Sequence, residues 1–152
     1  MENKFKAVGF TGTRNGMTEE QVLRLEYLLR HDLLQKSKRF NHGDCIGADR
    51  DAHKIADGIV KEIGLFPCTL TNQRAFCDGL DNKSNVIEAQ AAKHPLDRNL
   101  DIIASSDIMV GCPKGYKEER RGGTWHTIRN TRLAKKPLIL IYPNGDFTLE
   151  NI

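Results

Sequence analysis

The chain has 152 residues, a length that predicts a single domain spanning residues 1–152, and its content of 39% hydrophobic and 28% charged residues is typical of a soluble globular protein. A formal net charge of +3 is too small to indicate a protein that binds duplex DNA, and without a long apolar run we expect no membrane partner. The N-terminus lacks the pattern of a signal peptide, so we expect a cytoplasmic protein.

Strand-like and helix-like runs alternate along the first half of the chain. A buried strand is expected at 5–10, and Thr18 with Gln21 three residues later has the pattern of a capping box that begins a helix. Apolar residues at helical spacing extend that helix to about 36–38. The elements expected next are a short strand at 39–42, a helix over 48–63 that Gly64 ends, and an edge strand at 65–70 that contains Pro67.

The alternation continues in the second half, after a segment that is hard to interpret. Residues 71–94 are polar, and we expect a long loop there with one short helix at about 86–92. The elements expected after it are a helix from Pro95, a strand at 107–111, a helix from 123 to 134, a strand at 137–142 and a short edge strand at 147–149. The whole pattern predicts an α/β fold: a Rossmann-like, doubly wound, mostly parallel sheet of about five strands with helices on both faces.

Four glycine-containing turns are the most informative feature of the sequence. Three of them, at 12–14, 42–49 and 112–115, follow strand-like runs, and the fourth, at 122–124, opens the last long helix. In a parallel sheet such turns gather at the carboxyl ends of the strands, where these folds bind ligands. Because backbone N–H groups at helix N-termini favour anions, the turns predict a pocket for a phosphorylated molecule.

The charged loop and the cysteines are less specific. Residues 114–121 form either a solvated loop or a basic lid, in which Lys114, Arg120 and Arg121 clamp a phosphate. None of the cysteines has a partner at the spacing of a zinc site, so we expect free thiols, no metal and no cofactor.

Four motifs follow one another in a fixed order along the chain. They are G-F-T-G-T-R at 9–14, H-G-D-C-I-G-A-D at 42–49, Arg98-Asn99 followed by Ser106-Asp107, and G-G-T at 122–124 followed by Lys136-Pro137. In this order they resemble the SLOG superfamily, a Rossmann-like group that includes the LOG phosphoribohydrolases, the DNA-processing protein A family and stand-alone nucleotide sensors. The resemblance covers about residues 6–142 and is greatest to the small stand-alone members.

The resemblance implies a nucleotide pocket in which Thr13, Arg14 and Arg98 contact the ligand. The further residues that it implies are Gly43, Gly47, Ala48, Asp49, Gly122, Gly123 and Thr124. The residues around these motifs add Gly12, Asp44, Asn99, Pro113, Lys114, Trp125 and His126 as candidate ligand contacts. By analogy with the same group we also expect a homo-oligomer.

One departure from the family pattern bears on catalysis. The phosphoribohydrolases carry glutamate in the helical turn after the glycine-rich loop, whereas this chain has His126 and Thr127 there. Histidine supplies no negative charge to an oxocarbenium-like transition state, so the catalytic residue is unassigned, with Asp49 and His126 as candidates.

Three functions therefore stay open. The first is the binding of a nucleotide or nucleotide-derived signal, ADP-ribose-like or cyclic, by a sensor or a sponge. The second is a nucleoside 5′-monophosphate N-glycosidase. The third is single-stranded DNA binding, which the modest charge and the aromatic content of 7% disfavour.

Overall fold

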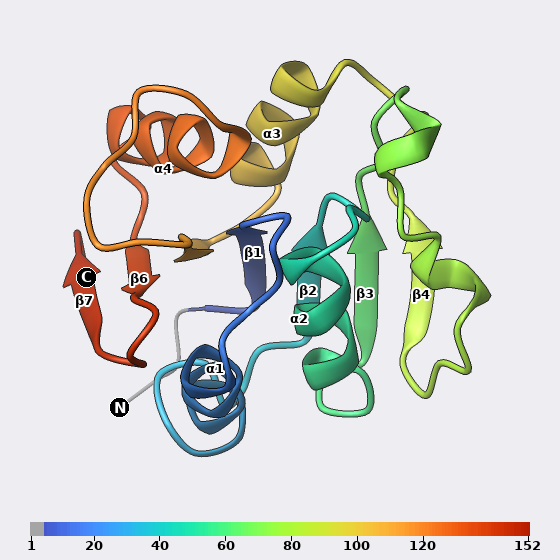
Figure 1. Ribbon diagram of the computed structural model, residues 1–152. Coiled ribbons are helices and arrows are strands. Elements are labelled where there is room, and N and C mark those ends of the chain that lie inside the picture. Colours follow the sequence, from blue (N-terminus) through green and yellow to red (C-terminus); the bar gives the residue numbers. More distant parts are fainter. Residues whose placement is uncertain (1–4) are drawn as a thin grey trace.

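The computed structural model describes residues 5–152, in which one seven-stranded sheet is covered by helices on both faces (Figure 1). The strands are β1 (Ala7–Gly12), β2 (Arg39–His42), β3 (Glu62–Leu65), β4 (Asn85–Glu88), β5 (Ile108–Cys112), β6 (Leu138–Ile141) and β7 (Phe147–Glu150). Their order in the sheet is β4-β3-β2-β1-β5-β6-β7, and every neighbouring pair is parallel except β6 and β7. The predicted Rossmann-like α/β class is confirmed, with two strands more than the five expected.

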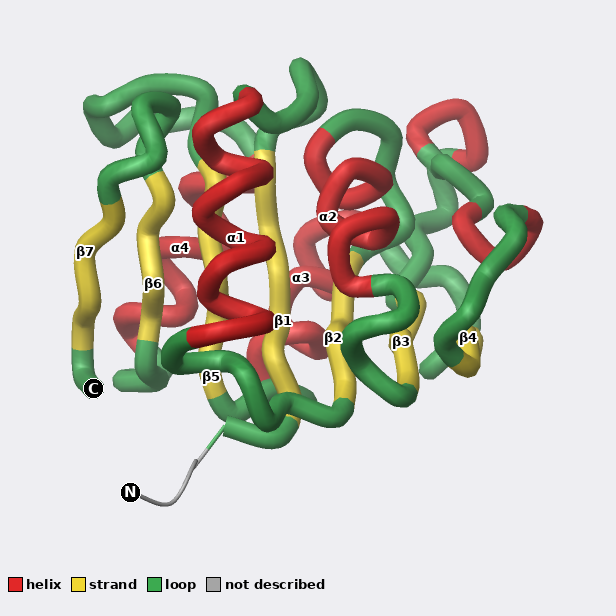
Figure 2. The backbone as a smooth tube through the Cα atoms, turned by 90° about the horizontal axis from the view of Figure 1, so that it is seen from below, coloured by secondary structure: helices red, strands yellow, loops and turns green. Residues whose placement is uncertain are grey.

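The helices lie in two layers. They are α1 (Glu19–His31), α2 (Ala48–Ala56), α3 (Pro95–Ala104) and α4 (Gly123–Leu133), with two short 3₁₀ segments at Thr71–Gln73 and Cys77–Gly79. Figure 2 shows α1 and α2 on one face of the sheet and α3 and α4 on the other. No helix within residues 5–152 is long and apolar enough to cross a membrane.

The core follows the same two layers. In β6, Ile139 and Ile141 belong to the cluster that contains the buried leucines of α1, while Leu138 and Leu140 pack with the cluster around α3 and α4. Successive side chains of a strand point to opposite faces of the sheet, so a strand covered on both sides has a continuous apolar sequence. This explains the continuous apolar sequence of β6, in which all four residues are buried.

The capping box that begins α1 is present. The Thr18 hydroxyl accepts a hydrogen bond from the Gln21 backbone N–H, and the Gln21 side chain accepts one from the Thr18 N–H. Gln21 Nε2 also donates to the carbonyls of Pro113 and Ile141, which ties the helix start to the ends of β5 and β6. The helix ends at His31 instead of at 36–38, because the chain turns there and buries Leu34 against the core.

The segment from 48 to 70 differs from its prediction. Helix α2 ends at Ala56, whereas the helix was expected to continue to residue 63. Ile63, the last residue of the expected helix, lies in β3. Gly64 sits inside β3, where an added Cβ would meet the side chains of Asn41 and Arg39. β3 is also an interior strand, between β2 and β4, and Pro67 follows its end instead of marking an edge.

The edge position belongs to β4. This strand, Asn85–Glu88, occupies the segment where a short helix was expected at 86–92, so that prediction is wrong. Val86 and Ile87 pair with Ile63 and Gly64 of β3. Neighbours in the sheet, which a local pattern does not contain, decide the structure of such short polar segments.

Candidate functional site

A pocket of about 560 Å³ opens at the carboxyl ends of β1 and β5. β1 pairs with β2 on one side and with β5 on the other, so the chain winds away from β1 in both directions. Ligands bind at such a switch point in open α/β sheets. The lining residues lie within five segments, 10–15, 43–49, 95–102, 113–121 and 122–125.

The structure brings most of the sequence-predicted residues into this pocket. Arg14, Arg98 and Thr124, which are far apart in the chain, share its lining. The other predicted residues that line it are Gly12, Thr13, Gly43, Asp49, Asn99, Pro113, Lys114, Gly122, Gly123 and Trp125. Asp44, Gly47, Ala48 and His126 lie outside the lining.

Gly47 and Ala48 belong to the second glycine turn and contact the first turn, at 12–14, outside the pocket. Gly47 has φ of 90°, and an added Cβ would collide with the backbone carbonyl of Arg14. The Ala48 N–H donates to the carbonyl of Thr13 at 2.9 Å, and the Ala48 side chain fills the space that Gly12 leaves open. These two residues therefore support the first turn without reaching the pocket.

Asp49 is the buried carboxylate of the pocket, with 7% of its surface exposed. Its Oδ2 accepts hydrogen bonds from the backbone N–H groups of Gly43 at 3.1 Å and Cys45 at 3.2 Å. Burial raises its pKa to about 6, and the positive charge of Arg98 and these backbone bonds oppose the rise. Two N–H groups of the second glycine turn, those of Gly43 and Cys45, are thus occupied by a carboxylate of the protein itself.

Most N–H groups of the Arg98 guanidinium donate to acceptors within the protein. Nη1 donates to the carbonyls of Gly43 at 2.6 Å and Phe66 at 3.0 Å, and Nε donates to Asn99 Oδ1 at 2.9 Å. Nη2 lies 3.5 Å from Cys45 Sγ. The side chain, whose residue is 5% exposed, therefore fastens α3 to the ends of β2 and β3 and leaves little hydrogen-bonding capacity for a ligand.

The N-terminus of α4 forms the opposite wall. Gly122 precedes the helix with φ of 105°, a conformation that favours glycine, and within residues 5–152 no side chain caps this helix. The first N–H groups of a helix have no intrahelical acceptor, so those of Gly123, Thr124 and Trp125 are available to an anion.

The charged loop adds cations to the same wall. Lys114 lies 3.6 Å from Glu119, while Arg121 makes no hydrogen bond or ion pair in the part of the chain that the structure describes. Glu118 pairs with Arg129 and Arg132, which ties the loop to α4. Together with Arg14, whose Nη2 donates to Gln73 at 2.6 Å, and with Arg98, four cations and the two carboxylates Asp49 and Glu119 line the pocket.

His126 lies on α4 outside the pocket lining. Its Nε2 is 3.3 Å from Asn130 Nδ2, and its Nδ1 is buried without a partner within residues 5–152. The buried Nε1 of Trp125, which does line the pocket, has no partner there either. Of the two candidate catalytic residues, the pocket therefore contains Asp49.

Asp44 belongs to a buried polar network on the other side of the second turn. Its Oδ2 accepts two hydrogen bonds from Arg74, at 2.8 and 3.1 Å, and its Oδ1 accepts one from the Cys77 N–H at 2.8 Å. The Asp44 N–H donates to His42 Nδ1 at 2.9 Å. Asp44 thus fastens the segment with the two 3₁₀ turns to the end of β2.

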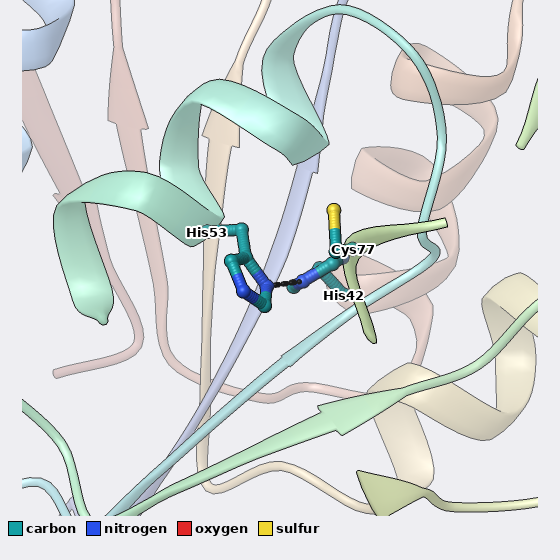
Figure 3. Close-up of side chains that lie close together, drawn as sticks. All are labelled: His42, His53 and Cys77. Atoms are coloured by element: carbon teal, nitrogen blue, oxygen red, sulfur yellow. Dashed lines mark hydrogen bonds between the residues drawn. The ribbon is translucent and has the colours of Figure 1, made fainter. Parts of the chain in front are cut away.

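Two histidines and Cys77 extend this network (Figure 3). His42 Nε2 lies 2.8 Å from His53 Nδ1, and His53 Nε2 lies 2.6 Å from Asn82 Oδ1. Because His42 Nδ1 accepts from Asp44, its Nε2 carries the proton and donates to His53, whose own Nε2 donates to Asn82. Every ring nitrogen is satisfied with both histidines neutral.

The same cluster has the composition of a metal site, since its three ligand atoms lie within 4.8 Å of one another. A metal at His42 Nε2 would need a lone pair there, but the lone pair of this neutral ring points to the Asp44 N–H. Burial, and then the charge of Asp44, also raises the pKa of the Cys77 thiol, which disfavours the thiolate that a metal binds. The hydrogen-bond pattern therefore fits a structural network better than a metal centre.

The sequence missed several lining residues. They are Phe10, Thr11, Asn15, Cys45, Pro95, Leu96, Ile102 and Glu119, while Arg121 belongs to the basic loop already noted. Pro95 and Ile102 lie on the helix face that carries Arg98 and Asn99, at spacings of three or four residues, so helical periodicity would have found them.

No protein-family model, curated protein or solved structure matches this chain.

Proposed function

We propose that this protein binds a nucleotide or a nucleotide-derived molecule in the pocket at the ends of β1 and β5. The observation that carries the proposal is the uncapped N-terminus of α4, which opens into the same pocket as Arg14, Lys114 and Arg121. Helix N–H groups with several cations suit a phosphate, because both supply charge-assisted hydrogen bonds to its oxygens.

The resemblance to the SLOG superfamily supports the same ligand class, since its glycine turns and G-G-T loop fall on this pocket. Within that class we propose an ADP-ribose-like or cyclic signalling nucleotide, held by a cytoplasmic sensor or sponge that acts as a homo-oligomer. Apolar lining from Phe10, Leu96, Ile102 and Trp125 gives a base a surface to pack against.

Isothermal titration calorimetry tests the proposal with AMP, ADP-ribose and a cyclic dinucleotide as probes. Adenosine, which lacks the phosphate, is the matched control and should bind at least tenfold more weakly than AMP, since charged hydrogen bonds are lost. Absence of binding by every phosphorylated probe, or equal affinity for adenosine and AMP, would contradict the proposal.

A second candidate is a nucleoside 5′-monophosphate N-glycosidase, and the placement of Asp49 favours it over other reactions. In that reaction water replaces the base at C1′ of the ribose, a carboxylate accepts the water's proton, and the departing base takes up a proton. A carboxyl group with a pKa of about 6 suits a general base near neutral pH. Chromatography for free base after incubation with nucleotides tests this activity, and Asp49→Asn should abolish it.

A further inference from the structure

The two walls of the pocket differ in what they offer a ligand. The wall at α4 offers N–H groups and the cation of Arg121, none of which has a partner within residues 5–152. The wall at α2 offers Asp49, a carboxylate that is fixed by Gly43 and Cys45 and almost completely buried. Helices α2 and α4 lie on opposite faces of the sheet (Figure 2). Residues of both helices line the pocket, so the pocket lies between these walls.

The wall at α2 is unsuitable for a phosphate. A glycine turn binds an anion through its backbone N–H groups, but those of Gly43 and Cys45 already donate to Asp49 Oδ2. The nearby Arg98 directs Nη1 and Nε to protein oxygens. A phosphate placed here would meet the charge of Asp49 in a buried setting, where like charges repel strongly.

Asp49 is instead able to accept further hydrogen bonds. Both backbone N–H groups donate to its Oδ2, and its other oxygen, Oδ1, receives neither of them. A carboxylate has about four acceptor positions, so the side chain retains capacity toward the pocket that it lines. The group that suits it is a donor, such as a sugar hydroxyl.

We propose that Asp49 accepts hydrogen bonds from hydroxyl groups of the ligand while the wall at α4 holds its phosphate, so that the pocket selects a phosphorylated sugar with free hydroxyls. This assignment rests on the proposed function and narrows it. It makes Asp49 a specificity-determining residue: a nucleotide that lacks its ribose hydroxyls gives this buried carboxylate no donor beyond the N–H groups of Gly43 and Cys45, and that costs affinity.

Calorimetry with AMP, 2′-deoxy-AMP and 2′,3′-dideoxy-AMP tests this assignment on the unmodified protein. AMP should bind at least about tenfold more tightly than the dideoxy analogue, as expected for a lost hydrogen bond to a charged group. Equal affinities for AMP and the dideoxy analogue would overturn the assignment of Asp49 and leave the proposed nucleotide function intact. If none of the three binds, the proposed function itself fails.

Asp49→Asn identifies the residue responsible, and Asp97→Asn is its charge-matched control. Asp97 is exposed on the first turn of α3 and is absent from the pocket lining. The preference for AMP over the dideoxy analogue should fall below about threefold in Asp49→Asn, because the variant loses the charge that strengthens the hydrogen bond, and should stay unchanged in Asp97→Asn. An unchanged preference in Asp49→Asn would overturn the proposal.

The pH dependence gives a readout that needs no variant. The ratio of the two affinities cancels the titration of the phosphate, which both ligands share. Beside Asp49 lie the guanidinium of Arg98 and the thiol of Cys45, whose pKa burial raises to about 12. The preference for AMP should therefore shrink between pH 7.5 and pH 5 as Asp49 takes up a proton, and a constant ratio would overturn its role.

Ribose 5-phosphate and inorganic phosphate separate the sugar from the base. If Asp49 binds sugar hydroxyls, ribose 5-phosphate should bind more tightly than inorganic phosphate, and Asp49→Asn should reduce that difference. Equal affinity for ribose 5-phosphate and inorganic phosphate would overturn the assignment.

Discussion

Two polar regions lie on either side of the second turn, and they differ in how far their hydrogen bonds are satisfied. His42 and Asp44 enter the buried network, whereas the residues that alternate with them, Gly43 and Cys45, line the pocket. In the network every ring nitrogen and carboxylate oxygen has a partner. In the pocket, the first N–H groups of α4 and the Arg121 side chain have none among the described residues, 5–152. Both regions contain polar and charged residues, so residue type does not distinguish the pocket from the buried network. The pocket differs because some of its donors have no acceptor within residues 5–152.

The largest expected effect comes from breaking the network at Asp44. This fully buried carboxylate holds Arg74 and the Cys77 N–H, so Asp44→Ala leaves a guanidinium and a buried donor unpaired. We expect a loss of about 3 kcal/mol in the free energy of unfolding, measured by urea denaturation.

Glu118→Ala is the matched control for that variant, since Glu118 also pairs with arginines, namely Arg129 and Arg132, but at the surface. Its cost should stay below about 1 kcal/mol, because exposed ion pairs are screened by solvent. Similar losses in Asp44→Ala and Glu118→Ala would mean that the network contributes no more than a surface cluster.

Lowering the pH should also change the stability that the two regions contribute, in opposite directions. Burial, and then His53 and Arg98, lowers the pKa of His42 well below 6.5, so below pH 6.5 the unfolded chain binds more protons and stability falls as pH falls. Asp49 has a raised pKa of about 6 against 3.8, so between these values the folded chain binds more protons and stability rises as pH falls. The two effects partly cancel in the unmodified protein.

Asp49→Asn should therefore reveal the contribution of His42. Urea midpoints at pH 7.5, 6.5 and 5.5 should show its stability falling by up to about 1.4 kcal/mol per pH unit below pH 6.5. At pH 7.5 the same variant should be more stable than the unmodified protein, by up to about 3 kcal/mol, because the buried charge is gone. If the double variant Asp49→Asn/His42→Gln shows the same dependence of stability on pH, the loss below pH 6.5 comes from groups other than His42.

The sequence predicted the fold class and the place of the pocket because both follow from local signals. The capping box at Thr18, the glycine turns and the alternation of helices and strands are each encoded within a few residues. The strand at 85–88 was missed because its exposed edge position carries little apolar pattern, and it forms by pairing with β3.

The sequence did not predict which residues of the second turn line the pocket. The motif at 42–49 marks Gly43, Asp44, Gly47, Ala48 and Asp49 alike, but only Gly43 and Asp49 line the pocket. Which of them do so depends on long-range partners, such as the Arg74 that holds Asp44 and the Arg14 backbone that lies against Gly47. Arg98 illustrates the same limit, because its bonds to the Gly43 and Phe66 carbonyls come from remote segments.

A smaller effect is expected for Arg121, whose side chain tests whether a cation of the pocket contacts the ligand. Arg121→Ala should weaken AMP binding about threefold to fivefold, and the remaining affinity should depend less on salt, because an exposed charge interacts with phosphate through solvent. Arg120→Ala is the matched control: Arg120 is adjacent, absent from the pocket lining, and contacts Arg129 only through its backbone carbonyl. Equal losses in the two variants would show a diffuse charge effect instead of a contact.

The smallest effect is expected at Gln73, which links the two regions. Its side chain accepts a hydrogen bond from Arg14 Nη2 at 2.6 Å, and its carbonyl accepts one from the Ile46 N–H, so it joins the 3₁₀ segment to both pocket turns. Gln73→Ala keeps the backbone bond and frees Arg14, so AMP affinity measured by calorimetry should fall no more than about threefold, since the lost bond is exposed. A loss as large as that of Arg14→Ala would mean that Gln73 fixes the guanidinium in its binding position, and the network would then support the pocket instead of lying beside it.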